Sequence, residues 1–360
     1  MSTIKDYLKY YKNSTFDEYK FNELDNILFS ELSYINWKGI VSAGIKKIKL
    51  NDAIKIYLDN LSNAEKEKMS PFMKSNIDNL EIIKDSVRYK HCYLSNFIND
   101  VNDKKQFGAL CIMFNEGDCY VGFKGTDSTL VGWKEDMALG YTFPTLAQVD
   151  AINYLNQVIN WKVKNVYVGG HSKGGNLAMC AYMYANKKVK KKVKQVFNND
   201  GPGFRDKEYN SNEYQDLLLK LKMFVPEGSI VGILLNSPPY FKIVKSTNNG
   251  PYEHDCNTWM CFGSFFVEGV QSNISKKFKE KIDEFINNYT DSKKEKLVNS
   301  FFKVLEEADI KSFNEISSMQ WNQFVEIVKG INDIDAKTKD LFLDVFKNFI
   351  MKRKDKDKKK

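Results

Sequence analysis

The sequence predicts an α/β protein whose core is a mostly parallel β-sheet flanked by helices. Between about residues 146 and 225, β-branched apolar runs of strand length alternate with amphipathic segments of helical length. Such alternation is typical of parallel strands joined by crossover helices. The chain has 360 residues, of which 42% are hydrophobic and 14% aromatic, so it is large enough to bury one large core or two smaller ones.

Four regions differ in their residue pattern. Residues 1–90 form a mostly helical lead-in, with helical apolar spacing in FNELDNILFSELSYI and MKSNIDNLEIIKDSV. Residues 91–273 form the α/β core, and residues 274–350 return to amphipathic helices such as KLVNSFFKVLEEA. Residues 351–360 are a lysine-rich tail that we expect to be disordered.

The elements of the core follow from strand and turn patterns. Three strand-like runs come first, around HCYLSNFINDV, FGALCIMF and CYVGFKG, and Asn115-Glu116-Gly117-Asp118 between the last two has the composition of a hairpin turn. The alternating part is then predicted as a helix near Leu146–Val158, a strand at Val163–Val168, a helix from Gly174, and strands at Val193–Asn198 and Leu221–Val225.

The N-terminus MSTIKDYLKYYKN lacks the apolar segment of a signal peptide, and no uncharged apolar run approaches the length that spans a bilayer. We therefore expect a cytoplasmic protein. The six cysteines lie mostly in apolar stretches without a CxxC pair, which favours reduced core thiols over disulfides. A zinc site formed by His254, Cys256 and Cys261 lacks a fourth ligand at suitable spacing, so no metal and no cofactor is predicted.

The net charge of +8 is spread through the chain instead of gathering in one patch. The lysine run at Lys187–Lys194 falls between a predicted helix and a predicted strand, where a solvated turn is expected. Specific nucleic-acid binding is not indicated. The positive charge of the C-terminal lysine tail is also consistent with a weak contact with anionic membranes.

The segment NVYVGGHSKGGNLAMCAYMYA places Ser172 between a buried strand and a helix. NVYVGG is typical of a buried parallel strand, and GNLAMCAYMYA has small and apolar residues at helical spacing. Gly170 and Gly174 stand two residues before and after Ser172, where the strand and helix of a nucleophile elbow would otherwise collide. The N-terminus of the helix also favours developing negative charge. Ser172 is therefore predicted to be an exposed nucleophile.

An oxyanion hole is predicted upstream of the elbow. The strand CYVGFKG ends in Gly125-Thr126-Asp127, whose backbone N–H groups and Thr126 hydroxyl can face Ser172. The backbone N–H of Lys173 is the second predicted donor. Asp136 lies ten residues after Thr126, in GWKEDM.

These segments together resemble a known family. FKGTDSTLVGWKED and GGHSKGGNLA resemble the FRGT…W…D and GHSLGG motifs of the class 3 (fungal-type) lipases. With NNDGPGF, VPEGSIVG and EHDCNTW, they resemble the lipase-like Mbeg family of bacterial α/β-hydrolases, over about residues 21–259. The resemblance implies an α/β-hydrolase fold, with Ser172 as nucleophile, Thr126 and Lys173 as oxyanion donors, and Asp136 as the acceptor that holds the Thr126 loop. Turn formation and helix capping are the alternative roles of Thr126 and Asp136.

The chain has three histidines that are candidates for the general base. His91 precedes the hairpin in the wrong chain order, and the His171 side chain is expected to point away from the neighbouring serine. His254, in GPYEHDCNTW, follows the last predicted strand and completes the order serine, acid, histidine that this fold requires. We therefore predict His254 as the general base.

The acid departs from the lipase pattern, because alignment of VPEGSIVGIL places Ser229 where an aspartate is expected. Asp200, at the end of the strand QVFNND, is the preferred acid because it projects from the carboxyl edge of the sheet. Glu227 is the second candidate. Asp255 is the last, because adjacent side chains rarely align in a triad. As an alternative, Asp200 is only an Asp-Gly turn residue.

Two functions follow from these residues. The first is a serine hydrolase that cleaves an ester, of acyl or lipid-like character, through an acyl-enzyme on Ser172. The second is a catalytically degenerate hydrolase fold that binds a ligand or a protein partner, since a fold does not guarantee chemistry. The flanking helices form either a lid over an acyl pocket or ordinary packing elements. Acyl chain, head group and oligomeric state cannot be read from the sequence.

Overall fold

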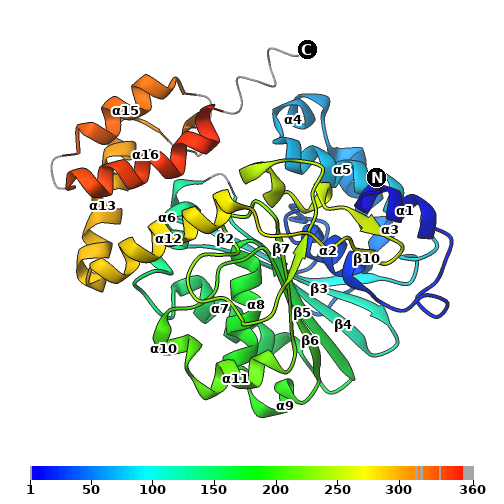
Figure 1. Ribbon diagram of the computed structural model, residues 1–360. Helices are drawn as coiled ribbons and strands as arrows, with labels where there is room; N and C mark the ends of the chain where they lie inside the picture. Colours follow the sequence, from blue (N-terminus) through cyan, green and yellow to red (C-terminus); the bar gives the residue numbers. More distant parts are fainter. Residues whose placement is uncertain are drawn as a thin grey trace.

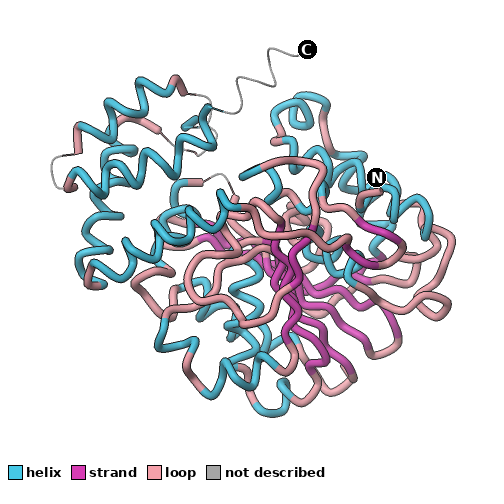
Figure 2. The backbone as a smooth tube through the Cα atoms, viewed as in Figure 1, coloured by secondary structure: helices cyan, strands magenta, loops and turns pink. Residues whose placement is uncertain are grey.

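The computed structural model describes residues 2–127, 129–310, 312, 315–316, 319–331 and 334–351. Its centre is an eight-stranded sheet whose strands follow one another in chain order, drawn in magenta in Figure 2. They are β1 (Ile48–Lys49), β2 (Tyr93–Val101), β3 (Gln106–Asn115), β4 (Asp118–Phe123), β5 (Asn165–His171), β6 (Val193–Asn199), β7 (Leu221–Pro226) and β8 (Lys242–Val244). A separate hairpin joins β9 (Cys261–Phe262) to β10 (Phe265–Phe266).

The predicted α/β architecture with a mostly parallel sheet is confirmed. β4 to β8 pair in parallel, and β1 to β4 form an antiparallel extension at one side. The hairpin turn after Asn115 is confirmed, with Gly117 at a φ of 84°. β1, β8 and the β9–β10 hairpin were not predicted, because strands of two or three residues carry no readable alternation.

Helices cover both faces of the sheet (Figure 1). α2 (Glu23–Leu32) packs on β4 and β5 from one side, whereas α7 (Leu146–Val158) and α8 (Lys173–Tyr184) pack on the other side. The remaining helices before residue 260 are α1 (Ile4–Tyr11), α3 (Leu50–Asn60), α4 (Asn63–Lys68), α5 (Pro71–Ile83), α6 (Leu130–Ala138), α9 (Lys187–Lys190), α10 (Asp206–Tyr209), α11 (Asn212–Leu218), and the short 3-10 helices η1 (Gly250–His254) and η2 (Cys256–Thr258).

The strands separate two apolar cores. Along β3, Leu110 and Ile112 point into the core beneath α2, while Ala109 and Cys111 point into the core beneath α7 and α8. This is the two-residue alternation of a strand that is buried on both faces, and it explains why β3 reads as a nearly continuous apolar run. All six cysteines are free and buried, as expected.

The C-terminal helices form a third apolar cluster beside the sheet. They are α12 (Asn273–Asn288), α13 (Asp291–Glu307), α15 (Trp321–Lys329) and α16 (Ala336–Met351), coloured yellow to red in Figure 1. Phe301 and Phe324 of this cluster pack with Leu130 of α6. The lysine tail lies outside the described residues from position 352 onward.

The lysine run at Lys187–Lys194 is not only a solvated turn. Lys187–Lys190 form the one-turn helix α9, whose Val189 side chain is buried, and β6 begins at Val193. The lysines of this turn remain at the surface while valine side chains anchor it to the core. The turn prediction missed this one-turn helix, because its single buried residue, Val189, stands among lysines.

A buried ion pair joins α2 to the segment that precedes β2. The Asp25 carboxylate of α2 accepts hydrogen bonds from Nε and Nη2 of Arg88 at 2.9 and 2.5 Å. The same carboxylate accepts from the Tyr7 and Tyr89 hydroxyls at 3.1 and 2.9 Å. Both charged side chains are almost completely buried. Residues 1–90 thus contribute a polar anchor to the core beneath the sheet.

Replacing Asp25 with alanine should leave the Arg88 guanidinium buried without its charged partner and lower the free energy of unfolding by about 3–5 kcal/mol. Asp78→Ala is the control, because it breaks the half-exposed Lys5–Asp78 pair and should cost at most about 1 kcal/mol. Urea unfolding of both variants measures the difference. Equal losses would contradict the anchoring role of Asp25.

Candidate active site

Ser172 lies at the sharp turn between β5 and α8. It is only 8% exposed because the Gly125 loop packs against it, so the prediction of an exposed side chain was wrong. Its backbone has φ 59° and ψ −133°, a conformation that non-glycine residues rarely adopt. A Cβ at Gly170 would collide with the Gly174 backbone, and a Cβ at Gly174 would collide with the Phe123 carbonyl. The turn therefore requires glycine at both positions, and it has the strained geometry of a nucleophile elbow.

Asp200 stands beside the elbow on the neighbouring strand. β5 and β6 pair in parallel with His171 opposite Asn199, so Ser172 and Asp200 both follow the carboxyl ends of their strands. The Ser172 N–H donates to the Asn199 carbonyl at 2.9 Å. Asp200 has a positive φ of 53° and its side chain is fully buried.

The structure brings His254 to Asp200. Nδ1 of His254 lies 2.6 Å from Oδ2 of Asp200. Because a carboxylate only accepts hydrogen bonds, Nδ1 carries the hydrogen when Asp200 is ionised and Nε2 is free to act as a base. His254 ends η1, and its partly exposed ring lies against the ring of His171, the residue before Ser172, with 4.5 Å between the centroids. His254 and Asp200 are thus joined at the edge of the sheet where Ser172 lies, and the described hydrogen bonds include none between the Ser172 hydroxyl and His254.

Further hydrogen bonds hold the Asp200 carboxylate. Oδ1 accepts from the Ser229 hydroxyl at 2.5 Å and from the Gly232 N–H at 3.1 Å. Burial raises the pKa of Asp200, and the hydrogen bonds from His254, Ser229 and Gly232 oppose this rise by stabilising the charged form. Ser229, which occupies the position where the lipase pattern expects the acid, is therefore a hydrogen-bond donor to Asp200.

The two alternative acids point elsewhere. Oε1 of Glu227 accepts from the Val270 N–H at 2.9 Å. The Asp255 carboxylate accepts from the backbone N–H and the side-chain amide of Asn257, both at 3.0 Å. Neither carboxylate has a hydrogen bond to His254 among those that the structure describes.

The loop after β4 lies against the elbow. A Cβ at Gly125 would lie 3.1 Å from the Ser172 Cβ, so the two backbones are in close approach. The Thr126 hydroxyl donates to Oδ2 of Asp136 on α6 at 2.5 Å. Asp136 therefore restrains the loop that also carries the Thr126 N–H, the contact that the resemblance implied.

The side chain of Lys173 is buried and paired. Its Nζ donates to Oε2 of Glu135 at 2.9 Å, and to the backbone and side-chain oxygens of Gln106 at 3.0 and 2.7 Å. Lys173 is 1% exposed, so its ammonium cannot reach a substrate. Its backbone N–H, at the start of α8, is the group that remains available near Ser172.

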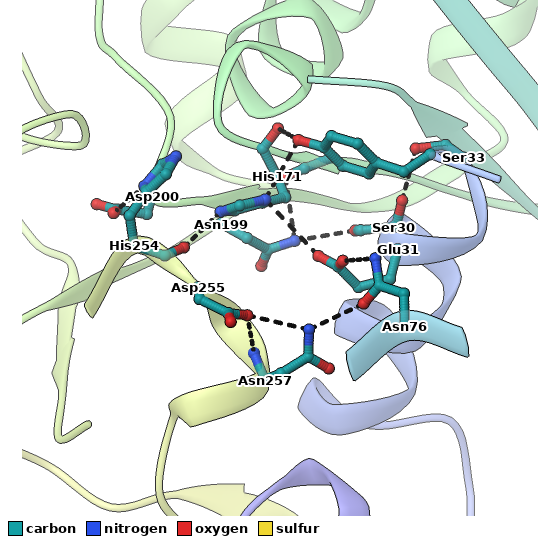
Figure 3. A network of polar contacts seen from close by, with 12 residues as sticks. Ser30, Glu31, Ser33, Asn76, His171, Asn199, Asp200, His254, Asp255 and Asn257 are labelled. Atoms are coloured by element: carbon teal, nitrogen blue, oxygen red, sulfur yellow. Dashed lines mark hydrogen bonds and ion pairs between the residues drawn. The ribbon is translucent and has the colours of Figure 1, made fainter. Parts of the chain in front are cut away.

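A buried polar network lies behind this edge of the sheet (Figure 3). His171 Nε2 donates to the His254 backbone carbonyl at 2.8 Å, and the Tyr34 hydroxyl lies 3.2 Å from His171 Nδ1. Oε1 of Glu31 lies 3.6 Å from the same nitrogen, and Oε2 of Glu31 accepts from Asn76 at 2.6 Å. Burial lowers the pKa of His171 and raises that of Glu31, which favours the neutral form of both groups.

Sequence reasoning did not identify these supporting residues. Asn26, Ser30 and Tyr34 recur every four residues within an apolar segment, and this polar stripe at helical spacing was the available signal. For Glu135 and Gln106 the sequence gives no such signal, because a single polar residue near the end of a strand or helix usually faces solvent. Their contacts with Lys173 depend on the folded arrangement of β3, α6 and α8.

One group of side chains has the composition of a metal site. Among the described residues, ligand atoms of Glu31, His171 and Cys256 lie within 4.8 Å of one another, and all three are buried. The zinc ligands considered from sequence are not brought together in this way, since His254 binds Asp200 and the Cys261 thiol donates to the Thr3 carbonyl.

Within the described part of the chain, no helix is both long and apolar enough to cross a membrane.

Asp136 should titrate in the folded protein, because burial raises its pKa from 3.8 to about 6 against the opposing effects of Lys173 and Thr126. A carboxyl with a raised folded-state pKa binds its proton more tightly when folded. Its contribution to the free energy of unfolding is therefore greatest below pH 3.8 and is lost as the pH rises to about 6.

Asp136→Asn should remove this pH dependence while keeping an acceptor for Thr126. The free energy of unfolding of the variant minus that of the wild type should rise across this window and stay constant above it. Urea titrations in half-unit pH steps measure it. A flat or falling difference would contradict the raised pKa.

Two solved structures are similar in part. One is a fungal lipase–inhibitor complex described as a model for interfacial activation, with 17% identity, 48% of this chain and 70% of that chain covered, and a TM-score of 0.34. The other is M37 lipase, with 12% identity, 58% and 68% covered, and a TM-score of 0.35. No curated protein matches. The Mbeg1-like family model matches residues 83–303, more than half of the chain, and the protein therefore belongs to the Mbeg1-like family.

Proposed function

We propose that the protein is a serine hydrolase that cleaves a carboxylic ester through an acyl-enzyme on Ser172. The observation that carries this proposal is the hydrogen bond between His254 Nδ1 and the buried Asp200 carboxylate, at the edge where Ser172 forms a strained elbow. A buried acid on Nδ1 orients the imidazole and stabilises its protonated form. A serine in an ordinary glycine turn has no neighbouring imidazole that a buried acid orients and stabilises.

In the proposed reaction, Ser172 Oγ attacks the ester carbonyl carbon and its proton passes to Nε2 of His254. The tetrahedral intermediate collapses when the bond to the leaving alkoxide breaks, and His254 returns the proton to that oxygen. The alcohol departs and the acyl group stays on Ser172. Water then attacks the acyl carbon and gives a proton to His254, the bond to Ser172 Oγ breaks as His254 returns that proton to Oγ, and the carboxylic acid is released.

The oxyanion of each tetrahedral intermediate needs fixed donors. We assign the backbone N–H groups of Thr126 and Lys173 to this role, with Asp136 restraining the Thr126 loop through the hydroxyl. The side-chain pairing of Lys173 with Glu135 supports the assignment, because it fixes the first turn of α8 without placing a mobile cation in the site. Preorganised donors of this kind stabilise the transition state without reorganisation.

The substrate class within this proposal is an acyl or lipid-like ester. Its support is the resemblance of the sequence motifs to lipases, and the position of the C-terminal helices beside the site. α16 contacts η1, which ends at His254, and α13 contacts α6, which follows the oxyanion loop. A cytoplasmic location belongs to the same proposal and is supported by the six free, buried cysteines.

Labelling of Ser172 tests the proposal directly. A fluorophosphonate probe should modify the wild-type protein at Ser172, identified by peptide mass spectrometry, and Ser172→Ala should abolish both labelling and hydrolysis of short p-nitrophenyl esters. Circular dichroism of the variant checks that it is folded. A folded wild-type protein that neither labels nor hydrolyses these esters would overturn the proposal and favour a binding module on a degenerate hydrolase fold.

Neutralising the acid should slow hydrolysis strongly. Asp200→Asn retains the volume of the side chain but favours the wrong His254 tautomer, so kcat should fall by up to about 10⁴-fold. Glu227→Gln is the matched control and should change kcat little, since Glu227 binds the Val270 backbone. Steady-state kinetics on a p-nitrophenyl ester measure both. A strong loss in Glu227→Gln with a silent Asp200→Asn would return the acid to the loop after β7.

A further inference from the structure

His171 has a contact that its place in the elbow does not require. Its ring is buried and its Nε2 lies 2.8 Å from the backbone carbonyl of His254. A carbonyl only accepts, so Nε2 must carry the hydrogen. The side chain of His171, the residue before Ser172, therefore holds the backbone of His254, the proposed base.

The His254 segment is a place where such a contact matters. His254 ends the five-residue 3-10 helix η1 and is followed by the short η2. The neighbouring Glu253 is fixed by the Gly228 and Gly250 N–H groups, each at 2.8 Å, and its carbonyl accepts from Trp259. Apart from hydrogen bonds internal to η1, the described hydrogen bonds of His254 are those to Asp200 and His171.

The surroundings of His171 keep its hydrogen on Nε2. The Tyr34 hydroxyl lies 3.2 Å from Nδ1 and donates to the His171 carbonyl at 3.2 Å, and Oε1 of Glu31 lies 3.6 Å from Nδ1. Burial favours the neutral forms of His171 and Glu31. A neutral imidazole has one N–H, and the His254 carbonyl at Nε2 can only accept, so the hydrogen is on Nε2 and Nδ1 is the acceptor nitrogen. Phe72 packs on the ring, with 5.7 Å between centroids, and restricts its rotation.

We propose that His171 is a positioning residue for the reaction: its Nε2–H fixes the backbone of His254 and so sets the distance of the His254 imidazole from Ser172. This rests on the proposed function. It assigns His171 no contact with the substrate. A general base displaced by about 1 Å can cost about 10²-fold in rate, so loss of this one hydrogen bond should reduce turnover without weakening substrate binding.

Two substitutions separate the hydrogen bond from the ring. His171→Phe keeps an aromatic ring against Phe72 but has no donor, and kcat on a p-nitrophenyl ester should fall about 10²-fold with little change in KM. The rate of fluorophosphonate labelling of Ser172 should fall in parallel. His171→Gln retains an N–H donor and should recover at least part of this loss. His91→Phe, the same exchange at an exposed histidine, is the control and should resemble the wild type.

Imidazole NMR of the wild-type protein tests the inference without variants or turnover. The ¹⁵N shifts of His171 should identify the Nε2–H tautomer, and the downfield Nδ1 proton of His254 should be observed. In His171→Phe that proton should broaden or disappear, and in His171→Gln it should return.

Three results would overturn the proposal: a His171 hydrogen on Nδ1, equal labelling rates in His171→Phe and His91→Phe, or equal losses in the Phe and Gln variants. A wild-type protein that does not label at all refutes the proposed function instead, and the tautomer measurement distinguishes that case.

Discussion

The approach of three backbones at Ser172 is the constraint on which the site depends. The end of β4, the end of β5 and the first turn of α8 are too close to admit a side chain at Gly170 or Gly174. This contact fixes the strained backbone of Ser172 and presses the Gly125 loop against it. Strain of this kind persists only where the surrounding structure determines the conformation. Here the sheet on one side and α8 on the other supply that support.

A second layer of contacts is polar and comes largely from the N-terminal helices. The Asn26 and Ser30 side chains of α2 bind the Asn199 side chain, at 2.8 and 3.0 Å, directly before Asp200. Glu31 of the same helix and Tyr34, two residues after its end, then reach His171. The N-terminal helical segment therefore helps to hold the segments that carry Asp200 and His254, in addition to packing on the sheet.

Much of the fold was predictable because it depends on local patterns. α7 was predicted at its observed bounds, and β6 and β7 within one residue, since β-branched runs and helical spacing are properties of neighbouring residues. Ser172 was recognisable for a similar reason, because both glycines lie in the same pentapeptide. The preferred choice of Asp200 depended on its place at the end of a strand.

The contacts that were not predicted join distant parts of the chain. His171 was expected to point away from the site, and its ring does avoid Ser172, but sequence could not indicate that it meets the His254 carbonyl. Glu135 and Lys173 are 38 positions apart and Ser229 and Asp200 are 29 apart. Such pairs are determined by how strands and loops pack in three dimensions. The local residue patterns of a single sequence do not report which distant segments come into contact.

The buried Lys173–Glu135 pair constrains how this pentapeptide can change over evolution. A leucine in place of Lys173, as in GHSLGG, would leave the Glu135 carboxylate enclosed without its cation, and removal of Glu135 alone would isolate the ammonium. Either single step costs several kcal/mol, whereas exchanging both residues for apolar ones can be neutral. The two positions are therefore expected to covary among relatives, and a lineage moves between the lysine and leucine forms of the elbow through a paired substitution.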